Sequence, residues 1–126
     1  MFTVGQGLYG RIRFRDGCMP EYDRTYLIVD VKTDTLGLLN VSSIAGKEHK
    51  LLFPSNRSLE NENPPFLKKS FVKLDSLVYI SIAQANGLIT LHSGDTLNNV
   101  ELASIISQLE LNNQHRTQGY GSRGKW

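Results

Sequence analysis

Apolar and polar positions alternate along the first predicted strand, Leu8–Arg15. One side of it is formed by Leu8, Gly10, Ile12 and Phe14, and the other by Tyr9, Arg11, Arg13 and Arg15. A period of two is typical of a strand with one buried face. Gly17 and Pro20 then interrupt the pattern and predict a loop.

The next apolar stretches predict a sheet core. Thr25–Val31 is rich in β-branched and aromatic residues, which favours a strand buried on both faces. Leu36–Ser42 follows a turn at Asp34 as a third strand. Lys50–Phe53 is short enough for an edge strand. Residues 54–65 are polar and turn-rich, so a long surface loop is expected there, of a kind that is often functional.

Three more strands are predicted at Leu67–Leu74, Leu77–Ile82 and Leu88–His92. Six or seven short strands that are close in sequence and joined by turns indicate a mainly β, antiparallel barrel or sandwich.

The period changes after Gly94. Apolar residues recur near helical spacing from Leu97 to Leu109, which predicts one helix ending near Leu111, with Ser93 or Asp95 as its N-cap. Residues 112–126 have little to bury and carry three basic side chains, so we expect a flexible basic tail after a domain over 1–111.

The totals limit the class of protein. A chain of 126 residues is long enough for one domain, and its 40% hydrophobic content is ordinary for a globular protein. No apolar run approaches the roughly 18 residues of a membrane span, and the first 14 residues lack the apolar stretch of a signal peptide. A single cysteine, Cys18, cannot form an internal disulfide, which favours a reducing cytoplasm. The net charge of +2 is compatible with a nucleic-acid partner without requiring one.

The histidines show no metal-ligand spacing. His49, His92 and His115 lie far apart in the sequence, and no carboxylate cluster accompanies them. We therefore expect no metal or other cofactor.

Three segments, in this order, carry a resemblance to a known family. First, a strand carrying YGRI (residues 9–12) is followed by a loop and by Arg24, which opens the hydrophobic strand 24–29. Second, a strand ends in NVSS (residues 40–43), with Ser42 and Ser43 as small hydroxyl residues. Third, the sequence LKKSFVKLDSL spans residues 67–77. Together with the glycine turn at 87 and the closing helix, they resemble the MazF/PemK toxins over residues 8–111. Thr25 stands where that family usually has proline.

This resemblance implies a small SH3-like antiparallel β-barrel with a C-terminal helix (α+β), as in the MazF, PemK and CcdB toxins. It also implies a type II toxin that acts as a metal-independent endoribonuclease, cutting single-stranded RNA at short sequences to leave a 2′,3′-cyclic phosphate. Homodimerisation and inhibition by a cognate antitoxin are the partner expectations. Arg24 would stabilise the transition state and take part in proton transfer, while Ser42 or Ser43 would hold the phosphate.

Other residues are candidates for RNA contacts. Arg11 and Arg13 share a predicted strand face with Arg15 and would follow the phosphates. Tyr22 or Phe66 would stack on bases. The remaining candidates are Lys47, Lys68 and Lys69. For each a purely structural role is open: a solvated charge, an edge-strand lysine, a turn serine or a packed aromatic.

Two other functions stay open at the level of sequence. A CcdB-like toxin would inhibit a partner such as DNA gyrase without catalysis, and the C-terminal Trp126 superficially fits that reading. A plain SH3-like binding module would have no toxicity. Arg24, followed by a buried strand and then serines, favours the nuclease.

Overall fold

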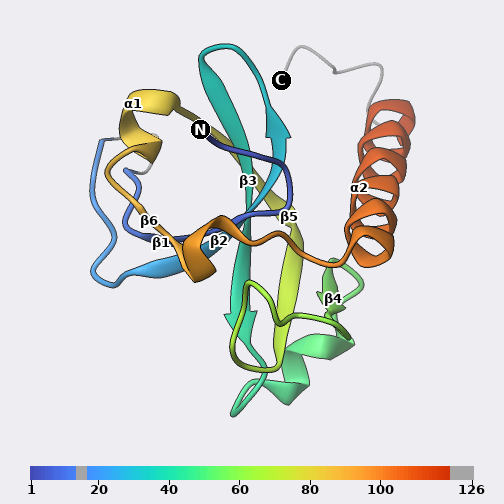
Figure 1. The fold of residues 1–126 in the computed structure, drawn as a ribbon. Helices are drawn as coiled ribbons and strands as arrows, with labels where there is room; N and C mark the ends of the chain where they lie inside the picture. Colours follow the sequence, from blue (N-terminus) through green and yellow to red (C-terminus); the bar gives the residue numbers. More distant parts are fainter. Residues whose placement is uncertain (14–16, 120–126) are drawn as a thin grey trace.

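The computed structural model describes residues 1–13 and 17–119, with side chains through Leu111. Its six strands form one antiparallel sheet in the order β4-β5-β3-β2-β1-β6, and a long C-terminal helix lies along one side of that sheet (Figure 1). The strands are β1 (Gly7–Gly10), β2 (Arg24–Val31), β3 (Thr35–Ser43), β4 (Asn56–Ser58), β5 (Ser70–Ser81) and β6 (Ile89–Thr90). The helices are η1 (Glu48–Leu52), α1 (Ile82–Ala85), η2 (Leu91–Gly94) and α2 (Asn99–Gly119).

The predicted mainly β fold with a C-terminal helix is confirmed. Strands β2 and β3 match the predictions 25–31 and 36–42 within one residue at each end. Their ladder pairs Thr25 with Val41 and Tyr26 with Asn40. The described strand ladders place β4 and β6 at opposite ends of an open order, so they do not show a closed barrel.

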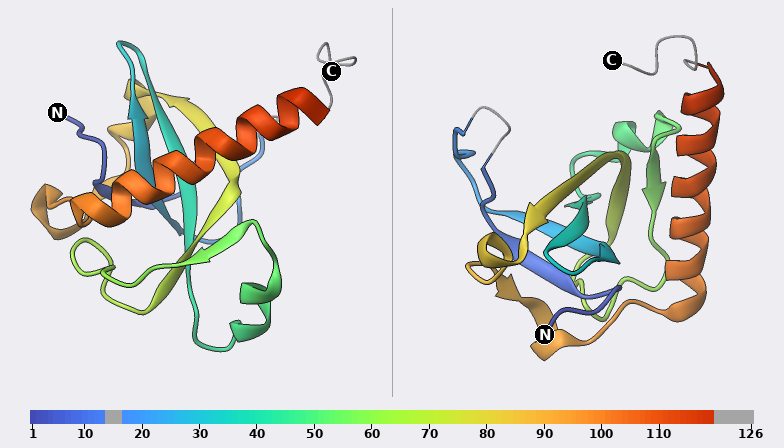
Figure 2. Two further views of the ribbon diagram at one scale, coloured as in Figure 1. Left: turned by 90° about the vertical axis from the view of Figure 1, so that its right-hand side faces the viewer. Right: turned by 90° about the horizontal axis from the view of Figure 1, so that it is seen from above.

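Each face of the sheet carries its own apolar core. On one face, Leu27 and Leu39 pack with Leu102 and Ile105 of α2. On the other, Ile28 and Leu38 pack with Ile80 at the end of β5. Because successive side chains of a strand point to opposite faces, β2 and β3 supply both cores. Figure 2 shows α2 crossing the first of these faces.

Helix α2 begins later than predicted. The N-cap is Asn98, whose side-chain oxygen accepts a hydrogen bond from the backbone N–H of Glu101 (3.0 Å). Ser93 belongs to η2 instead, and Asp95 follows it. The helix also continues past Leu111 to Gly119. The flexible tail predicted for 112–126 lies partly outside the described residues and stays a prediction.

One long strand replaces the two predicted at 67–74 and 77–82. In β5 the residues between Lys73 and Val78 bulge out, because Asn40 pairs with Lys73 and Leu38 with Val78. The Ser76 hydroxyl donates to the Lys73 carbonyl (2.6 Å) and accepts from the Asn40 N–H (2.8 Å). These bonds compensate for the interrupted ladder, so Asp75 and Ser76 mark a bulge rather than a turn.

In residues 48–58 the predicted strand and the predicted loop are both wrong. Instead of an edge strand at 50–53 there is the 3₁₀ helix η1, in which Leu52 and its neighbour Phe53 are exposed. The strand β4 lies inside the segment predicted as loop, and it pairs with β5. Its polar sequence gives no apolar alternation. Arg57 holds it to α2 by donating to Ser104 (2.7 Å) and Gln108 (2.6 Å).

The first and last predicted strands are shorter than expected. β1 ends at Gly10 and β6 has two residues, both paired with β1. In the described part of the chain, no helix has the length and apolar character needed to cross a membrane.

Candidate functional site

Arg24 is the exposed first residue of β2, which lies inside the sheet between β1 and β3. Its backbone pairs with Gly10 of β1, and the next pair of the neighbouring ladder is Thr25 with Val41. Arg24 therefore lies between a residue without a side chain and the end of β3. Among the described residues, no ion pair involves the Arg24 guanidinium.

The two serines at the end of β3 point to opposite faces. One step beyond the Thr25–Val41 pair, Ser42 lies opposite Arg24, so the two side chains share a face. The Ser42 hydroxyl donates to the side-chain oxygen of Asn40 (3.4 Å), which lies on that face as well. Ser43 pairs with Ser70 and points to the other face.

A lysine that the sequence analysis passed over belongs to the same face. Lys73 of β5 pairs with Asn40 on one side and with Asn56 on the other. Burial lowers the pKa of its ammonium, and the nearby positive charges of Lys50, Arg24 and Lys47 lower it further, against the opposing effect of Asp75. We call Arg24, Lys47, Lys50 and Lys73 the basic cluster.

A cleft of about 590 Å³ adjoins Arg24 on this face. Arg13, Asn40 and Ser76 line it with polar groups, and Tyr79 and Gln84 lie further along. We call it the Arg24 cleft. Arg13 and Arg24 both border it.

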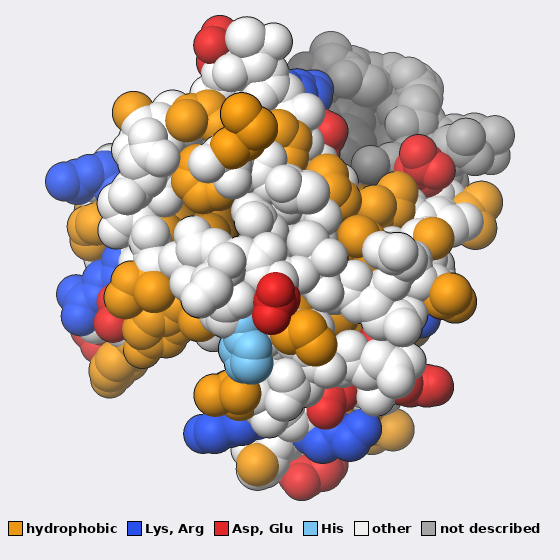
Figure 3. Space-filling model, in the orientation of Figure 1, with side chains coloured by type: hydrophobic (Ala, Val, Ile, Leu, Met, Phe, Trp, Pro, Cys, Tyr) orange, Lys and Arg blue, Asp and Glu red, His pale blue; other side chains and the backbone are white. Residues whose placement is uncertain are grey.

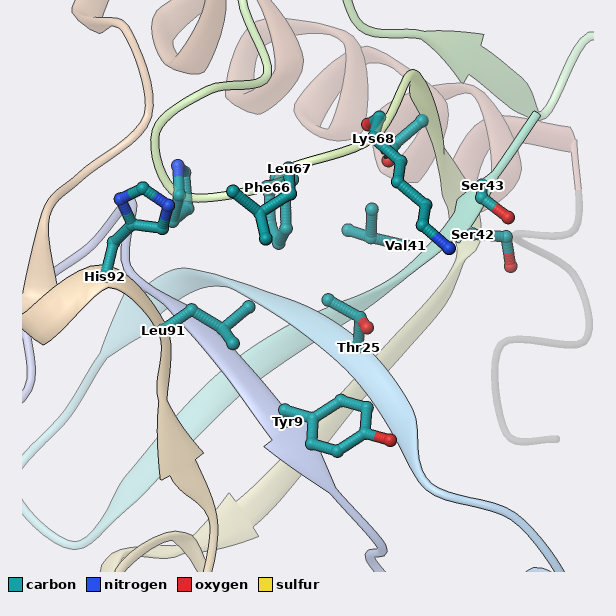
Figure 4. Close-up of a pocket in the computed structure, with 12 residues that line it drawn as sticks. Tyr9, Thr25, Val41, Ser42, Ser43, Phe66, Leu67, Lys68, Leu91 and His92 are labelled. Carbon is teal, nitrogen blue, oxygen red and sulfur yellow. Dashed lines mark hydrogen bonds between the residues drawn. The ribbon is translucent and has the colours of Figure 1, made fainter. Parts of the chain in front are cut away.

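A second cavity, of about 370 Å³, lies on the opposite face of β2. Figure 4 shows Thr25 between Tyr9 on one side and the chain segment of Phe66, Leu67 and Lys68 on the other. Ser42, Ser43 and His92 also border it. We call it the Tyr9 pocket.

The predicted arginine stripe on one strand face is wrong. β1 ends before Arg11, so alternation does not extend to Arg13, and Arg15 lies outside the described residues. The Arg11 guanidinium makes an ion pair with Asp23 (3.2 Å), and Arg13 donates to the carbonyl of Gly17 (2.8 Å). Gly10 ends the regular strand with a positive φ of 148°.

The other predicted contacts are scattered over the surface. Tyr22 is exposed just before β2, whereas Phe66 is 3% exposed, packs in the core and also borders the Tyr9 pocket. Lys68 borders the Tyr9 pocket. Lys69 instead pairs with Glu62 (3.7 Å). Lys47 belongs to the basic cluster.

Lys50 and Lys73 are the charges that sequence reasoning missed. Lys73 alternates with the apolar Val72 and Leu74, so the face on which it lies could be predicted once Leu67–Leu74 was taken as a strand. The closeness of Lys73 to Lys50 could not be predicted, because it depends on how residues 44–55 fold. Figure 3 shows that Lys and Arg side chains lie mainly at the edges of the face seen there.

The arrangement suits an anion. Like charges that face one another are stabilised by a negatively charged ligand, and a hydroxyl and an amide beside them can hydrogen-bond to phosphate oxygens. Within the described residues, no group of three His, Cys, Asp or Glu side chains could hold a metal ion. No protein-family model and no curated protein matches this chain.

Proposed function

We propose that this protein is a metal-independent endoribonuclease, a toxin of the MazF/PemK kind, that cuts single-stranded RNA at the Arg24 cleft. The observation that carries the proposal is the basic cluster beside Ser42. The exposed Arg24 lies opposite the Ser42 hydroxyl. Arg24, Lys47 and Lys50 lie close enough to Lys73 for their positive charges to lower its pKa. A phosphate needs such a set of donors and charges.

The chemistry uses a nucleophile that RNA itself supplies. The 2′-oxygen attacks the adjacent phosphorus, the bond from phosphorus to the 5′-oxygen breaks, and a 2′,3′-cyclic phosphate and a 5′-hydroxyl are formed. The 2′-hydroxyl loses its proton and the leaving 5′-oxygen gains one. Negative charge accumulates on the phosphorane oxygens, and groups that stabilise this charge lower the barrier.

The residues divide this work by their chemistry. Arg24 can bind two phosphoryl oxygens at once and stays charged, so it stabilises the phosphorane. Ser42 donates a hydrogen bond to the same phosphate; Ser43 is less suited because it points to the other face. Lys73 has a lowered pKa, which suits it better than an arginine for the proton transfer.

The wider assignment follows the same proposal. A small SH3-like barrel, a homodimer, a cognate antitoxin and a cytoplasmic location would accompany a toxin of this kind. The six-stranded antiparallel sheet with a terminal helix is consistent with that architecture. An antitoxin segment that carries acidic residues would complement the basic cluster.

The test is a digest of a long, defined RNA by the purified protein in the presence of EDTA, with mapping of the new 5′ ends. We expect cuts at a short recurring sequence that leave a cyclic phosphate. Arg24→Ala should lower the rate at least ~100-fold, the scale on which one transition-state donor acts.

Lys32→Ala is the matched control because it removes one positive charge just after the far end of β2, where the ammonium lies over the Tyr79 ring (4.9 Å) and outside the basic cluster. It should cleave like the unaltered protein. Full cleavage by Arg24→Ala would remove the assignment of this site. Absence of cleavage by the unaltered protein would reject the nuclease and leave a binding module.

A further inference from the structure

The Tyr9 pocket is not used by the chemistry at Arg24, although it borders the same strand end. Ser42 connects the two, since it lies opposite Arg24 and also borders this pocket. The structure describes every residue that lines the pocket; none of them is acidic, and Lys68 contributes a positive charge. The pocket and the basic cluster lie on opposite faces of the sheet, so a ligand that used both would pass around the end of β3 at Ser42.

Tyr9 presents a partly exposed ring on a strand whose backbone is paired on both sides. The side chain is 39% exposed, although its backbone is paired on both sides, with Thr25 of β2 and Ile89 of β6. An exposed aromatic ring on a fixed backbone is a platform for stacking, because little conformational entropy is lost when a planar ligand binds.

The rim also offers groups that can read the edge of a ring. Thr25 contributes a hydroxyl, Lys68 an ammonium and His92 an imidazole (Figure 4). His92 and Ser93 both have positive φ angles, 48° and 53°, which side chains other than glycine rarely adopt. Such backbone strain is common where a residue is held in position for a ligand.

From these observations we propose that the Tyr9 pocket binds one unpaired nucleobase of an RNA strand that passes around the end of β3 from the phosphate held at the basic cluster. This inference rests on the proposed function and adds a base-reading subsite to it. A volume of about 370 Å³ lies at the lower end of small-ligand pockets, which fits one base better than an extended chain. A stacked base with its edge hydrogen-bonded is the usual way in which single-stranded RNA is read.

The first experiment titrates the full-length protein with AMP, GMP, CMP and UMP, and separately with inorganic phosphate, while amide and side-chain NMR signals are followed. At least one nucleotide should shift the signals of Tyr9, Thr25 and His92. Phosphate alone should shift only residues of the basic cluster, which separates base recognition from simple anion binding.

Two variants test the stacking. Tyr9→Ala should weaken binding of that nucleotide about tenfold or more, as is typical for loss of one stacked base. Tyr9→Phe keeps the ring and should bind within about twofold of the unaltered protein. In the RNA digest, Tyr9→Ala should relax the choice of base beside the cut while Tyr9→Phe preserves it.

The outcomes separate the two proposals. If no RNA is cut but a nucleotide still binds at Tyr9, the pocket stands and the nuclease falls. If RNA is cut and no nucleotide shifts Tyr9, Thr25 or His92, the base subsite is overturned alone. Shifts caused by a tetraglutamate peptide, with none from the nucleotides, would identify a peptide surface and also overturn the inference.

Discussion

At the scale of single residues, Lys73 shows that bringing like charges together destabilises the folded chain. Its ammonium is half-buried and faces Lys50, Arg24 and Lys47, all of which favour its neutral form. An anion that binds among these groups relieves the repulsion. The same groups that weaken one another in the free protein thus strengthen the binding of a phosphate.

Replacing Lys73 by Gln should therefore weaken the binding of single-stranded RNA of any sequence. The slope of log affinity against log salt concentration should become shallower by about 0.7, the value for one phosphate contact on a single strand. Fluorescence anisotropy at several salt concentrations measures both quantities. Lys32→Gln serves as the control with the same change in net charge. An unchanged salt slope for Lys73→Gln would place Lys73 outside the RNA path.

Tyr79 is a residue whose side-chain pKa changes when the chain folds. Its hydroxyl donates to the Asp30 carboxylate (2.6 Å), and this bond, with burial and the negative charge of Asp30, raises the pKa of Tyr79 from 10.0 to about 12. The bond joins β5 to β2 across β3, where Gly37 leaves room for the ring: a Cβ there would lie 2.9 Å from it.

The pH dependence of stability follows from that shift. Between pH 10 and 12 the folded chain retains a proton that the unfolded chain loses, so the contribution of Tyr79 is full below pH 10 and falls as the pH rises towards 12. Urea unfolding at several alkaline pH values should show this fall in the unaltered protein and less of it in Tyr79→Phe. Equal slopes for both proteins would contradict the shift.

At the scale of elements, α2 is more than a cover for one face of the sheet. Glu101 in its first turn is 5% exposed, and its carboxylate accepts hydrogen bonds from the backbone N–H groups of Glu60 (2.7 Å) and Asn61 (2.8 Å). Together with Arg57, it attaches the segment after β4 to the helix. That segment leads to Phe66 and Lys68 at the Tyr9 pocket.

Glu101→Ala should lower the free energy of unfolding by about 2 kcal/mol, because two backbone donors in a partly buried place lose a charged acceptor. Urea denaturation followed by circular dichroism measures this. Glu110→Gln, on an exposed turn of the same helix, should change stability by less than about 0.5 kcal/mol. Similar values for the two variants would show that the segment is held by its apolar contacts instead.

At the scale of the whole molecule, β2 and β3 join two cores that lie on opposite faces. Leu38 and Leu39 are neighbours in the chain, yet each is fully buried in a different core. Loss of either core exposes strands that the other needs. The molecule should therefore unfold as one cooperative unit.

Ile105→Ala in the α2 core and Leu38→Ala in the other should each destabilise the protein by about 3 kcal/mol, the usual cost of such a truncation at a fully buried site. In both variants, NMR signals from the two faces should disappear at the same urea concentration. Separate transitions would mean that the sheet faces unfold independently.

Local pattern was sufficient where burial itself determines the structure. The buried strands β2 and β3 and a C-terminal helix follow from apolar period and chain order alone. It failed where long-range partners decide. β4 is a strand because β5 pairs with it and α2 binds Arg57. β5 continues through Asp75 and Ser76 because a hydroxyl bridges its bulge to β3.

The candidate site divides in the same way. The resemblance to the MazF/PemK toxins made Arg24 and a serine pair the candidates for holding a phosphate. Only the sheet register decides that Ser42 rather than Ser43 shares a face with Arg24. Only the folded segment 44–55 brings Lys47 and Lys50 to Lys73. The sequence states which charges exist, but the distances between them depend on strand pairing far along the chain, and electrostatic energy depends on those distances.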